Sequence, residues 1–203
     1  MMKLEALRHL TQNIPDLQGP ALQKWLQEQL ISMGLDPHAI YQELEMTSRF
    51  VDTHRDTSYS NMQMQLHSHT FWELLYCINS CGAEYLVGSE RYRLQQGDLI
   101  FLPPGISHRP LLPEKMESPY MRYVLWLSTE FMTLYASLCP DLFWLRPSGA
   151  GMLRTAGTAW EHIGGLFHAG VQEAEQKADG WEAAVMGNTL QLQIGRASCR
   201  ERV

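Results

Sequence analysis

The chain changes its hydrophobic period twice, and this constrains its fold more than any other feature. Between Met62 and Leu127, short runs rich in Leu, Ile, Val, Tyr and Phe are separated by turn residues about every 8–12 residues. Such spacing is typical of antiparallel strands that close into a barrel or a sandwich. Between two of these runs, Gly88-Ser89 predicts a tight hairpin turn. We expect strands near residues 62–67, 72–78, 83–87, 91–94, 98–102, 107–111 and 121–127.

Helical spacing precedes this region. One apolar face predicts a helix that ends at Gly34, and its members are Leu22, Trp25, Leu26, Leu30 and Met33. A second helix is expected from His38 to about Met46, after an Asp-Pro pair that favours a helix start. Nothing in either helix points to catalysis.

Helical spacing returns after the strands, with helices expected at about 129–138, 156–177 and 180–193. In the last of these helices, a stripe recurs at close to heptad spacing: Trp181, Val185, Asn188 and Leu192. Two interpretations are open for this stripe. It packs against the rest of the domain, or it forms the seam of a dimer.

The final ten residues, IGRASCRERV, break the preceding pattern. They equal the translation of one reading frame of a standard short-read sequencing adapter. We therefore interpret residues 194–203 as an artefact and leave them out of the fold argument. The natural coding sequence is then expected to continue past Gln193, and the chain to be an N-terminal fragment of a longer protein.

Composition and charge narrow the function classes. Hydrophobic residues make up 45% of the 203 residues, which suffices for a globular core. The formal net charge is −6, and it is about −8 without the final ten residues, which hold three Arg and one Glu. An acidic chain of this kind is a poor candidate for binding the phosphate backbone of nucleic acid, because such binding requires clustered Lys and Arg side chains.

The chain is expected to be cytoplasmic and to make no membrane contact. No apolar run approaches the roughly 20 residues that a membrane span needs, and charged residues interrupt the leucines of the N-terminus, unlike a signal peptide. The cysteines, which are Cys77, Cys81, Cys139 and Cys199, form no CxxC pair and are expected to be reduced thiols. We interpret Cys77 and Cys81 as apolar positions of the core and not as nucleophiles.

Four polar residues form the most informative constellation. On a strand, His67 and His69 point to one face because side chains alternate. A short turn at residues 70–72 would bring Glu73 back beside them, and His108 follows a Pro-Gly turn and would enter from a neighbouring strand. Three imidazoles and a carboxylate suit Fe, Mn, Ni, Zn or Cu, so the residue types do not select one metal.

The motif HxHxxxE, followed by GxxxxxPxGxxH, resembles the paired motifs of the cupin superfamily. The resemblance implies a mainly β fold, a cupin double-stranded β-helix barrel flanked by N-terminal and C-terminal helices. The implied organisation is an N-terminal helical segment at 1–58, the barrel at 59–127 and C-terminal helices for dimerisation at 128–193. One departure is Leu112, which occupies a position where the family usually has Asn. This departure weakens the resemblance to the enzymes of the family without excluding a metal.

A narrower resemblance rests on three stretches: LHSHTFWELLY, YLVGSERYRLQQGDLIFLPPGISHRP and MRYVLWLSTEF. Over roughly residues 60–135 they are similar to the N-terminal domain of AraC/XylS-type transcriptional regulators. The resemblance implies a non-enzymatic domain that binds a small-molecule effector such as a sugar and forms a homodimer. DNA would be bound only by a C-terminal domain with two helix-turn-helix units. No such units precede Gln193, as expected of an N-terminal fragment.

Three interpretations are open for the four polar residues. They hold a divalent transition metal, they hydrogen-bond the effector, or they are inherited barrel residues satisfied by their neighbours. The aromatic and basic residues of the strands also suit an effector pocket; they are Tyr85, Tyr92, Arg93 and Trp126. The alternative is that two of the four face solvent or the outer helices, and strand alternation alone does not decide which two. The candidate effector-binding residues are thus His67, His69, Glu73, Tyr85, Arg93, His108 and Trp126.

No residue is predicted to be catalytic, and no cofactor other than a possible divalent metal is expected. One rival from another function class is a stand-alone metal-dependent cupin enzyme, an isomerase or a dioxygenase, that uses the same four polar residues. Another is a non-catalytic oligomerising cupin.

Overall fold

The computed structural model describes residues 24, 25, 28, 29 and 32, and then 46–60, 66–138 and 151–198. The chain forms two compact units, Met1–Gln42 and Glu43–Val203. The described residues of the first unit are helical, in agreement with the helix expected there, and Lys24 Nζ lies 3.9 Å from Glu28 Oε1 one turn later. The helix expected from His38 onwards falls almost entirely outside the described residues.

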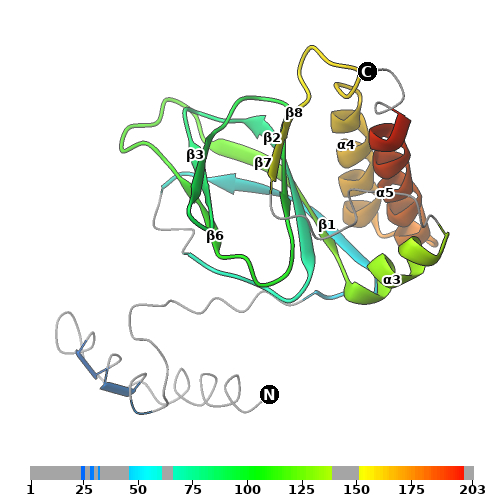
Figure 1. Cartoon of the computed structure of the whole chain (residues 1–203), viewed down its shortest axis with the longest axis horizontal. Helices are drawn as coiled ribbons and strands as arrows, with labels where there is room; N and C mark the ends of the chain where they lie inside the picture. Colours follow the sequence, from blue (N-terminus) through cyan, green and yellow to red (C-terminus); the bar gives the residue numbers. More distant parts are fainter. Residues whose placement is uncertain are drawn as a thin grey trace. The chain divides into compact units, whose positions relative to one another are not determined.

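The second unit is built on two antiparallel sheets that face each other (Figure 1). One sheet has five strands in the order β1-β7-β2-β5-β8, and the other has three strands in the order β4-β3-β6. The strands are β1 Val51–Ser58, β2 Trp72–Asn79, β3 Glu84–Val87, β4 Glu90–Arg93, β5 Asp98–Leu102, β6 His108–Leu111, β7 Tyr120–Leu127 and β8 Gly151–Arg154. The space between the sheets is called the barrel interior below.

Helices cover the outer face of the five-stranded sheet. They are α3 Thr129–Leu138, α4 Ile163–Gln176 and α5 Trp181–Ser198, and α4 lies alongside α5 (Figure 1). No helix in the described part of the chain is both long enough and apolar enough to cross a bilayer.

Strand alternation gives the five-stranded sheet two buried faces. On β7, Leu125 and Leu127 pack with the helices, whereas Tyr120 and Val124 belong to the second core between the sheets. Side chains of successive residues point to opposite faces of a strand, so one strand can contribute to both cores. The fold class predicted from the sequence is confirmed, because the second unit is a mainly β barrel of two facing sheets with helices on one side.

The predicted hairpin is also present. Val87 pairs with Glu90, and only Gly88 and Ser89 connect β3 to β4. Gly88 has a φ of +57°, a conformation that glycine adopts without the steric cost of a side chain. Of the expected strands, only the one at 62–67 lies mainly outside the described residues.

Two strands were missed, and both change the predicted domain limits. Residues 51–58, assigned from the sequence to the helical segment, form β1, so the limit at residue 58 is wrong. Its sequence VDTHRDTS is polar at most positions, and it becomes a strand because it pairs with β7 along its whole length. Residues 151–154, assigned to the C-terminal helices, form β8 against β5, where Arg154 makes two hydrogen bonds to Asp98, at 3.0 and 3.1 Å.

The C-terminal helices differ from the prediction at their ends. α4 begins at Ile163 and not near residue 156, because Gly157 has a φ of +70° and the chain turns twice before the helix. α5 extends to Ser198, into the segment assigned to the adapter. Its predicted stripe packs inside the domain, since Val185 and Leu192 are buried in the core beneath the helices.

We predict that Gly164→Ala destabilises the protein and that Gly165→Ala does not. A Cβ at Gly164 would lie 2.5 Å from the hydroxyl oxygen of Tyr76, whose ring stacks on Phe167 with centroids 5.5 Å apart. Overpacking of this kind costs about 1–3 kcal/mol in the free energy of unfolding. A Cβ at Gly165 meets nothing within 4 Å, so alanine there should gain about 1 kcal/mol from helix propensity. Urea unfolding measures the difference in stability between the two variants. Equal midpoints would contradict the close contact between Gly164 and Tyr76.

We also predict that the Cys77 thiol resists alkylation in the folded protein. Cys77 is 2% exposed, and burial raises the pKa of its thiol to about 12, with the Asp98 carboxylate adding to the rise. The thiolate is the reactive form, and it is scarce at pH 8. Iodoacetamide labelling at pH 8, followed by peptide mass spectrometry, should modify Cys77 only after denaturation. Rapid labelling of Cys77 in the native protein would show that this core opens.

Candidate functional site

The backbone brings the first and last residues of the predicted constellation together. His67 and His108 form an isolated antiparallel bridge, with His67 N donating to His108 O at 3.2 Å and His108 N donating to His67 O at 2.9 Å. Their rings meet edge to face, with centroids 4.3 Å apart. The loop before β6 is attached to the same segment, because Gly105 N donates to His69 O at 2.8 Å.

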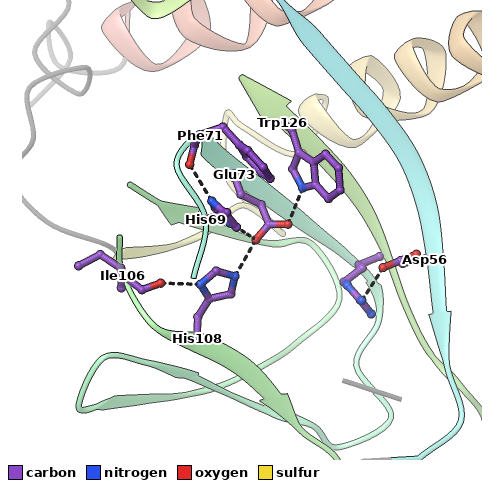
Figure 2. Close-up of polar contacts among 8 residues, drawn as sticks. Asp56, His69, Phe71, Glu73, Ile106, His108 and Trp126 are labelled. Carbon is purple, nitrogen blue, oxygen red and sulfur yellow. Dashed lines mark hydrogen bonds and ion pairs between the residues drawn. The ribbon is translucent and has the colours of Figure 1, made fainter. Parts of the chain in front are cut away.

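Glu73 lies at the centre of the site, as Figure 2 shows. It is the second residue of β2, on the face that points into the barrel interior, and its side chain is 6% exposed. Its Oε2 lies 3.3 Å from His69 Nε2 and 3.0 Å from His108 Nε2. All four residues of the predicted constellation are therefore buried together, although His67 and His69 do not belong to one regular strand.

Backbone carbonyls fix the orientation of two imidazoles. His69 Nδ1 lies 2.8 Å from the carbonyl oxygen of Phe71, and His108 Nδ1 lies 2.8 Å from that of Ile106 (Figure 2). Only an Nδ1–H can donate to a carbonyl, so in the neutral ring Nε2 would carry a lone pair. Both Nε2 atoms would then direct that lone pair toward the carboxylate of Glu73.

Lone pairs that face a carboxylate repel it unless a proton or a cation lies between them. A cation bound between the nitrogen atoms and the carboxylate oxygen would satisfy all of these groups. His108 Nε2 is buried and, despite its distance to Glu73, has no hydrogen-bond partner with suitable geometry among the described residues. Ligand atoms of His67, Glu73 and His108 lie within 4.8 Å of one another. The donor set thus fits a transition metal, whose histidine ligands commonly donate their second N–H to a carbonyl.

The electrostatic balance keeps Glu73 ionised. Burial alone would raise the pKa of this carboxyl, but the interactions with His108 and His69 outweigh it and hold the pKa well below its usual range. An ionised carboxylate in an apolar interior is stable only when it is paired and hydrogen-bonded. The charge of Glu73 is therefore balanced within the site by the groups around it.

Trp126 completes the contacts of Glu73. The indole Nε1–H donates to Glu73 Oε1 at 2.7 Å, and the two residues are directly paired across β2 and β7. Trp126 is half-buried, and its ring also packs on Phe71 at 4.7 Å and on His54 at 5.1 Å between centroids. Trp126 thus holds one carboxylate oxygen while the other faces the histidines.

Tyr85 and Arg93, which are also predicted effector residues from the three-stranded sheet, have different positions. Tyr85 is buried in the barrel interior and stacks on His108, with centroids 6.2 Å apart. Arg93 is exposed on the edge strand β4 and pairs with Glu84, one position away from Tyr85 and therefore on the outer face. The inward position opposite Tyr85 belongs to Tyr92. The structure does not bring Arg93 to the site.

Sequence analysis missed a second polar group of the interior. Arg122 is 1% exposed and forms an ion pair with Asp56 on β1 at 2.6 Å. Arg122 could have been found, because it precedes Trp126 by four residues and therefore shares its face of the strand. Asp56 could not, since no pattern predicted its strand.

No protein-family model matches the chain, and no curated protein matches it. Solved structures match at low identity. The Cupin 2 conserved barrel domain protein from Salinispora arenicola is 17% identical, with 48% of this chain and 79% of that chain covered and a TM-score of 0.35. Salicylate 1,2-dioxygenase from Pseudoaminobacter salicylatoxidans, in complex with gentisate, is 11% identical, with 52% and 25% covered and a TM-score of 0.35.

ToxT from Vibrio cholerae, bound to (E)-4-(8-methylnaphthalen-1-yl)but-3-enoic acid, is 11% identical, with 70% of this chain and 55% of that chain covered and a TM-score of 0.43. The chain therefore spans about half of ToxT and a quarter of the dioxygenase. These likenesses concern the fold alone.

Proposed function

We propose that this chain is the small-molecule-sensing and dimerisation part of an AraC-type transcriptional regulator. The effector would enter the barrel interior and contact the polar cluster of His67, His69, Glu73 and His108. The DNA-binding domain would follow in the natural protein, beyond Gln193. Dimerisation would use the outward faces of α4 and α5, because the apolar stripe of α5 is buried inside the domain.

The main support is that the site and the helices lie on opposite faces of the same strands. Trp126, on β7, donates a hydrogen bond to Glu73 in the site. On the opposite face of β7, Leu125 packs in the core beneath the helices, and the Tyr123 hydroxyl lies 2.9 Å from His168 Nδ1 on α4. Only one sheet therefore separates Trp126 from α4, and a movement of Trp126 would shift the strand on which α4 packs.

This geometry suits a sensor that works by population shift. A ligand that binds better to one arrangement of Trp126 and β7 stabilises the matching arrangement of α4 and α5. Two DNA-binding domains attached beyond α5 would then change their spacing or orientation. The size of the response is limited by the difference in the ligand's affinity for the two arrangements.

Sequencing the source locus through the codon for Gln193 tests this function directly. We expect the frame to continue into two helix-turn-helix units. The purified chain, with a net charge of −6, should show no sequence-specific DNA binding in a gel shift at 150 mM salt. A stop codon within a few codons of Gln193, or tight specific binding by this chain alone, would refute the proposal.

A second candidate is a metal-dependent cupin enzyme, an isomerase or a dioxygenase. Two histidines reach the Glu73 carboxylate, and a ligand atom of His67 lies within 4.8 Å in the same cluster. The most specific observation in favour of this candidate is that the buried His108 Nε2 makes no hydrogen bond of suitable geometry to the described residues. His67, His69, Glu73 and His108 would hold the metal, which would act as a Lewis acid toward a substrate oxygen. The carbonyls of Phe71 and Ile106 would keep the His69 and His108 rings oriented.

Metal analysis tests this candidate. Protein purified without chelators should contain about one transition metal ion per chain, and His67→Ala or His69→Ala should weaken Zn²⁺ binding by at least about tenfold. His162→Ala is the matched control, because His162 is exposed and its Nδ1 contacts only its local backbone carbonyl at Ala159 in the described structure. Metal-free protein, or equal Zn²⁺ affinity in the His67→Ala and His162→Ala variants, would count against a metal centre.

A further inference from the structure

A buried arginine lies on the inward face of β7. Arg122 is 1% exposed, and its neighbours on that face, Tyr120 and Val124, belong to the core between the two sheets. The guanidinium donates from Nη2 to Asp56 Oδ2 at 2.6 Å and from Nη1 to Ser58 Oγ at 3.1 Å. Its central carbon lies 5.0 Å from the centroid of the Tyr120 ring.

The counter-ion of this arginine is much less buried than the arginine itself. The Asp56 side chain is 40% exposed, and Asp56 belongs to β1, the edge strand of the five-stranded sheet. His54, two residues earlier on the same face, is 39% exposed and lies 3.7 Å from Asp56. Asp56 therefore connects the interior arginine to solvent, and it can leave Arg122 without crossing the core.

An ion pair of this kind is weak evidence for a purely structural role. Removing a guanidinium from water carries a large desolvation cost, and well-packed apolar residues often replace buried ion pairs without loss of stability. A guanidinium is also the side chain best suited to bind a carboxylate with two parallel hydrogen bonds. An interior arginine with an exchangeable counter-ion is therefore suited to binding an anionic ligand.

We propose that Arg122 is the anion-binding residue of the barrel and that the ligand is a small organic carboxylate, which displaces Asp56. The inference rests on the proposed sensing function and names the chemical class of the effector. The bound carboxylate would replace the carboxylate of Asp56 on the guanidinium, so the charge balance of the interior is kept.

The distance between Arg122 and Glu73 indicates what chemical groups the ligand would carry besides its carboxylate. Arg122 and Trp126 share one face of β7 and are four residues apart, which is about 13 Å along a strand. Tyr85 lies within electrostatic reach of both Glu73 and Arg122; burial, and then Glu73, raise the pKa of Tyr85, whereas Arg122 lowers it. Between Arg122 and Trp126 on that face lies Val124, which pairs with Leu75 on β2, and both belong to the apolar core between the sheets. A ligand with a carboxylate at one end and an apolar or aromatic group next to it would match this arrangement of charged and apolar side chains.

Displacement of Asp56 would also give the ligand a mechanical effect. Asp56 pairs across β1 and β7 with Arg122, and α4 packs against both strands from the other side. Loss of the Asp56 contact would loosen β1 from β7 at that position. The sensing mechanism proposed above requires such a change beneath α4.

Matched acids and amides test the proposal by calorimetry on the whole chain. The probes are benzoate against benzamide and hexanoate against hexanamide. We expect each acid to bind at least about tenfold more tightly than its amide, and Arg122→Met to abolish this preference, since hydrogen bonds to charged groups are the strong ones. Arg55→Met is the control, because Arg55 is an exposed arginine of the same strand pair and should leave binding unchanged.

Asp56→Asn is expected to strengthen acid binding, whereas Arg122→Met is expected to weaken it. The proposal can therefore be tested even if the Arg122→Met variant does not fold. The Asp56→Asn change removes the competing carboxylate and keeps Arg122, so both acids should bind more tightly than to the wild type and should raise the Tm of this variant more. Equal affinity for acids and amides in both wild type and Asp56→Asn would overturn the proposal. So would an Arg122→Met variant that is folded by circular dichroism and binds the acids as Arg55→Met does.

These outcomes are separable from those of the sensing function. If the locus encodes helix-turn-helix units and the acids do not bind, the sensor stands and the carboxylate assignment falls. If the acids bind through Arg122 and the locus ends in a stop codon, Arg122 is an anion site of a different kind of cupin, and the sensing function falls.

Discussion

The charge of Glu73 is the constraint on which the rest of the site depends. An ionised carboxylate in the interior of a β-barrel is stable only if other groups replace the water it has lost. His69, His108 and Trp126 are those groups, and each comes from a different part of the chain. The orientation of the two imidazoles depends in turn on backbone carbonyls and on the bridge between His67 and His108. The contacts of Glu73 thereby connect β2 to His108 on β6 and to Trp126 on β7.

The five-stranded sheet connects this site to the helices. Its inner face carries the polar groups, and its outer face buries the apolar sides of α3, α4 and α5. Close packing at Gly164 and Tyr76 holds α4 against this sheet. Packed interiors resist small changes of volume. A side chain that moves on the inner face of the sheet would therefore shift the helices on the outer face, because the helices pack directly against the sheet. The same architecture would suit a rigid enzyme, and the metal content of the protein and the coding sequence beyond Gln193 distinguish the two functions.

Much of the fold could be predicted because the relevant patterns are local. The apolar runs of β2, β3, β5 and β7, the Gly88 turn and the helix after Leu127 all follow from spacing within a few residues. β1 could not be predicted, because its eight residues are mostly polar and become a strand only by pairing with β7. β8 has only four residues and so shows no strand pattern of its own; it forms by pairing with β5 and through the distant contact between Arg154 and Asp98.

The barrel class and the candidate polar cluster were predictable from the sequence, because the strand periods and the HxHxxxE spacing are patterns of neighbouring residues. Tertiary structure alone decided which strand faces point inwards. It placed Arg93 outside and Arg122 inside, and it buried Val185 and Leu192 within the domain. The physical reason is that inward and outward positions alternate along every strand, and only the partner strand and the packed layers select which set is buried.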